Sequence, residues 1–62
     1  MPHVTVQMLA GRTSQQKKDL IEEVTKAVCD SCRVPTEAVS VVIQELPREN
    51  WGRAGLPMSE RS

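Results

Sequence analysis

The chain has 62 residues, and its 8 Lys and Arg residues balance its 8 Asp and Glu residues to a formal net charge of zero. A chain this short forms one domain and needs a disulfide framework, a metal or partner subunits to complete its core. Cys29 and Cys32 are too few and too close for a disulfide framework, so partner subunits are expected. The balanced charge argues against nucleic acid and anionic membranes as partners, and no apolar run approaches the roughly 18 residues of a membrane-spanning helix. We therefore expect a soluble protein in a reducing, cytoplasmic setting.

The amino terminus carries a proline directly after the initiator methionine. Removal of Met1 would make Pro2 a secondary amine, a compact base that no side chain reproduces. On these two residues alone, a chemically idle chain end is the commoner outcome. However, the alternating residues that follow predict a strand that would hold the nitrogen in a fixed place, as a catalytic group requires.

The first half of the chain predicts a strand and then a helix. Residues 3–9 alternate with period two, with Val4, Val6 and Met8 on one face. After a turn at Gly11, Thr13 and Gln16 match a capping box that opens a helix over about residues 14–33. Apolar residues at spacings of three and four predict one buried stripe along this helix, made of Leu20, Ile21, Val24, Ala27, Val28 and Cys32.

The second half predicts one more strand and a turn-rich tail. Pro35 disfavours helical geometry at Val34 and helps to end the helix. Residues 39–45 are rich in β-branched side chains and predict a strand that needs cover on both faces. Residues 46–62 predict a loop or hairpin around Trp51, the chain's only aromatic residue.

These elements predict an α/β fold, in the form of a small α+β-like domain over residues 1–62: a single βαβ unit followed by the C-terminal hairpin. A crossover of this kind makes the two strands parallel and right-handed in nearly all proteins. One helix covers only one face of two strands, so the other face, which bears Val42, should be covered by another copy of the chain.

The chain resembles the 4-oxalocrotonate tautomerase family, the short members of the tautomerase superfamily. The resemblance runs from Pro2 to about Gly55. It is carried by the proline after the initiator, the turn at residues 9–13, the βαβ order, Glu45 at the end of the second strand and the Trp51-Gly52 pair.

The resemblance implies a homo-hexamer built as a trimer of dimers, with active sites at subunit boundaries and with no metal or organic cofactor. It implies a small-molecule substrate, the enol or keto form of a 2-oxo acid such as 2-hydroxymuconate or phenylenolpyruvate. By the same resemblance Pro2 is the general base, Arg12 binds the substrate carboxylate and Trp51 is an apolar wall. Val39 and Ser40 complete the substrate site. A guanidinium suits the role of Arg12 because it offers two parallel donors to a planar carboxylate.

Ser40 departs from the family pattern, because well-studied members carry a second arginine at this position to polarise the substrate oxygen. A hydroxyl does not replace that charge, so slower or differently directed tautomerase chemistry is expected. Arg48, Arg53 or Arg61 could supply a cation from another direction, and the spacing selects none of them.

Three alternatives stay open. A hydratase or dehalogenase of the same superfamily would use Pro2 as an acid and a carboxylate such as Glu49 to activate water. A non-catalytic oligomeric binding module would turn over no enol. The Cys29–Cys32 spacing also suits a redox or zinc site, but it lies at the end of the predicted helix and lacks a second ligand pair, which favours two ordinary cysteines.

Overall fold

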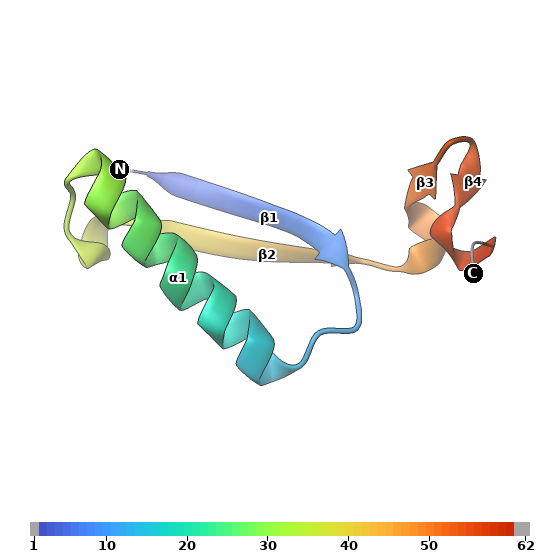
Figure 1. Ribbon diagram of the computed structural model, residues 1–62, viewed down its shortest axis with the longest axis horizontal. Helices are drawn as coiled ribbons and strands as arrows, with labels where there is room; N and C mark the ends of the chain where they lie inside the picture. The colour runs from blue at the N-terminus through green and yellow to red at the C-terminus, as the bar shows by residue number, and fades with distance from the viewer. Residues whose placement is uncertain (1, 61–62) are drawn as a thin grey trace.

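The chain forms a βαβ unit followed by a small hairpin, in a computed structural model that describes residues 2–60 (Figure 1). Strand β1 spans His3–Leu9, helix α1 spans Ser14–Cys32 and strand β2 spans Ser40–Leu46. The hairpin strands are β3, Gly52–Arg53, and β4, Leu56–Pro57. Three short 3-10 turns complete the chain: η1 Thr36–Ala38, η2 Arg48–Asn50 and η3 Met58–Glu60. The predicted fold class is confirmed.

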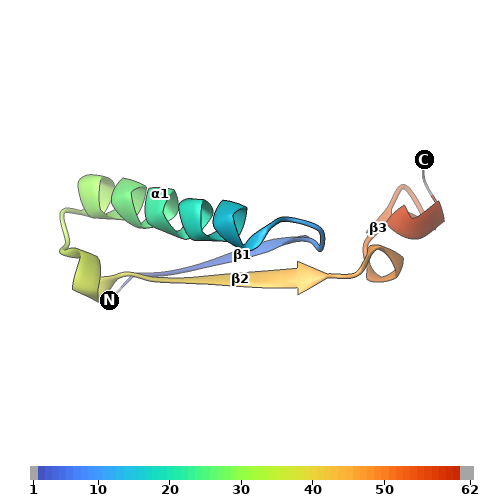
Figure 2. The same cartoon turned by 90° about the horizontal axis from the view of Figure 1, so that it is seen from below.

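The two long strands lie parallel, with His3 beside Ser40 and Leu9 beside Leu46. The predicted alternation in β1 is observed: Val4, Val6 and Met8 are half-buried, whereas the residues between them are exposed. Helix α1 covers one face of this sheet, and no other described element covers the opposite face (Figure 2). We call the covered face the inner face and the uncovered face, with His3, Thr5, Gln7, Ser40, Val42 and Gln44, the outer face.

The ends of helix α1 follow from local chemistry. The Thr13 hydroxyl accepts the N–H of Gln16 at 3.1 Å, and the Gln16 side chain accepts the N–H of Thr13 at 3.0 Å. This is the predicted capping box. The helix ends at Cys32 rather than at residue 33, because Arg33 takes a left-handed conformation at φ 59° and donates its N–H to the carbonyl of Cys29.

The predicted apolar stripe on the helix is only partly correct. Leu20, Val24 and Val28 are half-buried toward the sheet, as expected. However, Ile21, Ala27 and Cys32 are exposed, and Ile21 keeps 39% of its surface. A two-stranded sheet is narrower than the stripe, so the described part of one chain leaves these three residues uncovered.

No residue between 2 and 60 is buried in the isolated chain, which extends over 42 × 23 × 13 Å. Val42 on the outer face is 44% exposed and Leu56 on the hairpin is 48% exposed. A pair of strands without further cover is marginally stable in water. The geometry therefore agrees with the expectation that other subunits complete the core.

The hairpin extends from the end of β2, away from helix α1 (Figure 1). Arg53 pairs with Leu56, which leaves Ala54 and Gly55 as a two-residue turn with positive φ at both positions, 54° and 84°. This is the usual geometry of tight hairpins, and glycine suits it best. Within residues 2–60, no helix has the length and apolar character needed to cross a membrane.

Candidate active site

Pro2 and Ser40 lie together at one end of the strand pair. The Ser40 N–H donates to the Pro2 carbonyl at 3.1 Å, and Pro2 itself is half-buried. Val39, also half-buried, precedes Ser40 and ends η1, since its N–H donates to the carbonyl of Thr36 at 3.1 Å. Strand β2 begins at Ser40 and ends at Leu46, one residue later than predicted at each end. Three of the five predicted site residues therefore share this corner.

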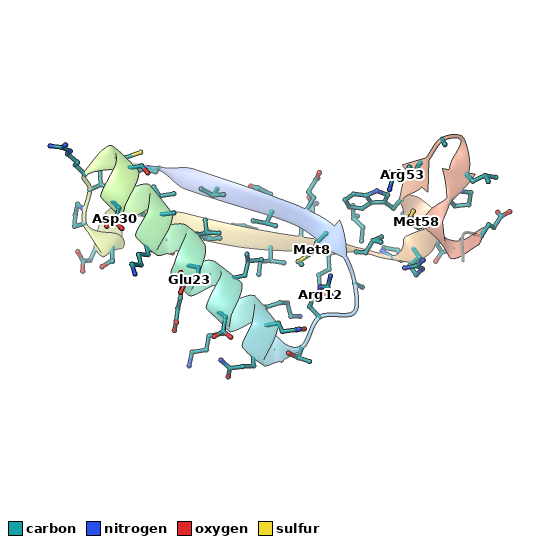
Figure 3. All side chains as sticks on the ribbon, in the orientation of Figure 1. Met8, Arg12, Glu23, Asp30, Arg53 and Met58 are labelled. Atoms are coloured by element: carbon teal, nitrogen blue, oxygen red, sulfur yellow. The ribbon has the colours of Figure 1, made fainter. Side chains whose placement is uncertain are left out.

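Arg12 lies at the opposite end of β1, in the turn that leads into the helix (Figure 3). The turn is anchored by a hydrogen bond at 3.0 Å from the N–H of Ala10 to the carbonyl of Leu46. Gly11 at φ 131° provides the reversal, a conformation that side chains rarely allow. Arg12 is exposed and lines a hollow of about 210 Å³, whose other walls are Met8, Gln16, Lys17 and Leu20.

One of the residues that line this hollow, Lys17, forms a salt bridge with Glu45. Lys17 Nζ lies 2.8 Å from Glu45 Oε1, and about a third of each side chain is exposed to solvent. The hydrogen bond from Lys17 lowers the pKa of Glu45 below its ordinary value of 4.5, against the opposing effect of desolvation. Arg12, by contrast, has no hydrogen bond or ion pair with any residue between 2 and 60. Its guanidinium is available to a ligand.

Trp51 lies on the hairpin side of the molecule, at the end of η2. Its N–H donates to the carbonyl of Arg48 at 3.3 Å and its carbonyl accepts the N–H of Met58 at 2.7 Å. The Arg48 guanidinium donates to the carbonyl of Met58 at 3.0 Å, so this arginine fixes the hairpin. Trp51 is half-buried there.

One chain does not bring all the predicted site residues together. Pro2 precedes β1 and Arg12 follows it, and seven residues at about 3.3 Å each separate the ends of this strand by roughly 20 Å. The hairpin strands β3 and β4, which directly follow Trp51, lie still farther along the same direction, beyond the end of β2 (Figure 1). A site that uses Pro2, Arg12 and Trp51 must therefore combine residues from different copies of the chain.

The other candidates from the sequence occupy separate places. Arg53 lies on strand β3 of the hairpin (Figure 3), and Arg61 lies outside the described residues. Glu49 is exposed on η2. Cys29 and Cys32 are free thiols, and residues 2–60 hold no group of three or more His, Cys, Asp or Glu side chains placed to bind a metal.

Sequence reasoning gave no role to Lys17 and did not pair it with Glu45. These residues are 28 positions apart, and no local spacing rule joins them. The period of β2 could have helped, because Glu45 shares the inner face with Val41 and Ile43, beneath the helix. A charged residue on a covered face needs a partner, and Lys17 in the first turns of the helix supplies it.

The comparisons with known proteins agree over almost the whole chain. The family model for tautomerase enzymes matches residues 2–61. A 2-hydroxymuconate tautomerase from Pseudomonas putida is 45% identical over 60 residues, which cover 97% of this chain and 95% of that protein. The same enzyme from Bacillus subtilis is 42% identical, with 97% of each chain covered.

Solved structures show the same fold. YwhB, a homologue of 4-oxalocrotonate tautomerase, superposes with a TM-score of 0.95 at 39% identity and covers 98% of this chain and 100% of its own. A heterohexamer 4-oxalocrotonate tautomerase from Chloroflexus aurantiacus also gives a TM-score of 0.95, at 32% identity with both chains fully covered. Members of this family thus form oligomers, as the uncovered surfaces of this chain require. The chain belongs to the tautomerase family of isomerases.

Proposed function

We propose that the protein interconverts the enol and keto forms of 2-oxo acids, with 2-hydroxymuconate and phenylenolpyruvate as representative substrates. The observation that carries this proposal is the position of Pro2, just before the start of β1. Its carbonyl accepts a hydrogen bond from the N–H of Ser40, and its nitrogen would be the chain terminus after loss of Met1. Similarity to 2-hydroxymuconate tautomerases over 97% of the chain supports the same chemistry.

In the proposed reaction the Pro2 nitrogen, in its uncharged form, accepts the hydroxyl proton of the enol and delivers a proton to carbon, which leaves the ketone. A base works best when it is uncharged near the working pH, and an apolar wall and a neighbouring cation both disfavour the charged form of an amine. Val39 lies next to Pro2 within the chain, and Arg12 and Trp51 would come from neighbouring copies.

Arg12 is proposed to bind the carboxylate of the substrate, and Trp51 and Ser40 are proposed to form walls of the pocket. The Arg12 guanidinium, which has no partner among the described residues, and the apolar side chains of Met8 and Leu20 around it suit an organic acid.

We propose a homo-hexamer, arranged as a trimer of dimers, as the assembly that joins these groups. The heterohexamer of the Chloroflexus aurantiacus relative supports this size. An amine and a guanidinium suffice for the reaction, so the proposal needs no metal or organic cofactor.

The test is the ketonisation of phenylenolpyruvate and of 2-hydroxymuconate, followed by ultraviolet absorbance with protein whose N-terminus is verified by intact mass. We expect turnover from chains that begin at Pro2. Pro2→Ala should lower kcat by about a hundredfold, which is within the usual contribution of a general base.

A matched pair of extended proteins provides the control. Two added residues at the amino terminus convert the Pro2 nitrogen to an amide, which is not basic, whereas the same two residues at the carboxyl terminus leave it free. Only the first should lose activity. Equal activity in both proteins would remove Pro2 from the mechanism, and no turnover by a verified, assembled parent would reject the proposed function.

A further inference from the structure

The corner of the molecule around the hollow holds two cations and one carboxylate. Arg12 and Lys17 both line the hollow, and Glu45 stands at the end of β2 beside them. The carboxylate is committed to Lys17 at 2.8 Å, and Arg12 has no partner among the described residues. This division of partners is unexpected, because a guanidinium binds a carboxylate through two parallel hydrogen bonds and an ammonium through one.

Glu45 lies near both cations, because it is paired in register with Met8, which lines the hollow together with Arg12 and Lys17. The backbone N–H of Gly11 is close enough to the Glu45 carboxylate to help lower its pKa, and Arg12 is the next residue in the chain. Lys17 lies five positions after Arg12, one turn into helix α1, and its ammonium reaches Glu45 across the inner face. Removal of Lys17 would therefore leave a carboxylate unpaired beside a free guanidinium.

We propose that Lys17 is a positioning residue that holds the Glu45 carboxylate away from Arg12 and so keeps Arg12 available to a substrate carboxylate. This rests on the proposed function of Arg12 and adds a residue to it. Lys17 acts through Glu45 and does not bind the substrate. Without Lys17, Glu45 competes with the substrate as an internal carboxylate.

The test is a double-mutant cycle with two measurements. The first is KM and kcat for ketonisation of phenylenolpyruvate, and the second is the calorimetric Kd of cinnamate, a carboxylate with no enol to convert. Lys17→Met should raise both KM and Kd about tenfold and change kcat less than about threefold, because a blocked Arg12 weakens binding. The double variant Lys17→Met/Glu45→Gln should return to within about threefold of the parent, because the competing carboxylate is gone.

Further variants serve as controls. Lys18→Met removes the same charge from an exposed neighbour outside the hollow, and it should leave Kd within about twofold of the parent. Lys17→Arg can still pair with Glu45 and should retain the parent's Kd. Circular dichroism and size exclusion establish that each variant is folded and assembled, and Lys17→Gln replaces Lys17→Met if the latter does not fold.

Each result decides the proposal. If the double variant binds cinnamate as weakly as Lys17→Met does, Lys17 binds the ligand directly. If Lys17→Met has the same KM and Kd as the parent, the ion pair has no such role. Both results overturn the inference. Failure of the parent to bind cinnamate would overturn it as well. If cinnamate binding follows the predicted cycle while no variant converts an enol, the inference stands and the tautomerase proposal fails.

Discussion

A backbone hydrogen bond holds Ser40 beside Pro2. The Ser40 side chain is a neutral hydroxyl, so it presents no positive charge to a substrate oxygen. The resemblance to 4-oxalocrotonate tautomerases implies an arginine at this position, so Ser40→Arg tests whether the site accepts that charge. We expect kcat for 2-hydroxymuconate to rise about tenfold, because a charge-assisted hydrogen bond is worth about 1.5 to 3 kcal/mol and part of it is realised in the transition state.

Ser40→Gln is the matched control, since it adds length and hydrogen-bonding groups without charge. Steady-state rates on both variants separate the two effects. If Ser40→Gln accelerates the reaction as much as Ser40→Arg does, charge is not what the parent lacks. If neither variant is faster than the parent, the proposed contact with the substrate oxygen is not made from residue 40.

Glu45 gives the stability of the protein a defined dependence on pH. Its pKa in the folded protein is lowered from 4.5, chiefly by the hydrogen bond from Lys17. A carboxyl group whose pKa is lower in the folded than in the unfolded protein stabilises the fold at pH values above the unfolded pKa. This contribution is lost as the pH falls through the folded pKa. We therefore expect the urea midpoint of the parent to fall more steeply than that of Glu45→Gln between about pH 5 and pH 3. Parallel curves for the two proteins would contradict the pairing.

At the scale of elements, the hairpin turn is strained at one of its two positions. Ala54 has φ 54° and Gly55 has φ 84°, so an alanine occupies a conformation that glycine or asparagine adopts at lower cost. Ala54→Gly should stabilise the protein by about 0.5 to 1 kcal/mol, and Gly55→Ala should destabilise it by about 1 to 2 kcal/mol. Thermal unfolding at one fixed protein concentration measures both, and changes of the opposite sign would refute this turn geometry.

The regular elements could be predicted because they depend on local chemistry. Alternation in β1 identified the faces of the strand, and Thr13 with Gln16 located the start of the helix. Prediction failed where the answer depended on distant contacts. Ile21, Ala27 and Cys32 have helical spacing but no sheet beneath them, and the Lys17–Glu45 pair joins residues 28 positions apart. Likewise, Pro2, Arg12 and Trp51 were predicted as site residues from the sequence, but the sequence did not show how far apart they lie in one chain.

At the scale of the whole molecule, the same geometry bears on both the stability of the protein and its proposed function. One chain buries none of its described residues, and one chain separates the proposed base, Pro2, from Arg12, the proposed carboxylate-binding residue, by the length of β1. The uncovered outer face and the exposed Leu56 on the hairpin call for cover by other subunits. Contacts that supply this cover would also be able to place Arg12 of one copy beside Pro2 of another.

This arrangement predicts complementation between two impaired variants. Pro2→Ala keeps Arg12, and Arg12→Ala keeps Pro2, so a mixed assembly contains some sites with both groups intact. If each site takes one group from each of two copies, random mixing at equal amounts should restore roughly a quarter of the parent activity. The two variants are unfolded together, refolded and assayed with phenylenolpyruvate.

As the control, Pro2→Ala is refolded with the double variant Pro2→Ala/Arg12→Ala, which contributes no intact Pro2 and should give no gain in activity. A mixture no more active than the sum of its separate components would mean that each chain supplies both groups to its own site, against the separation that β1 imposes.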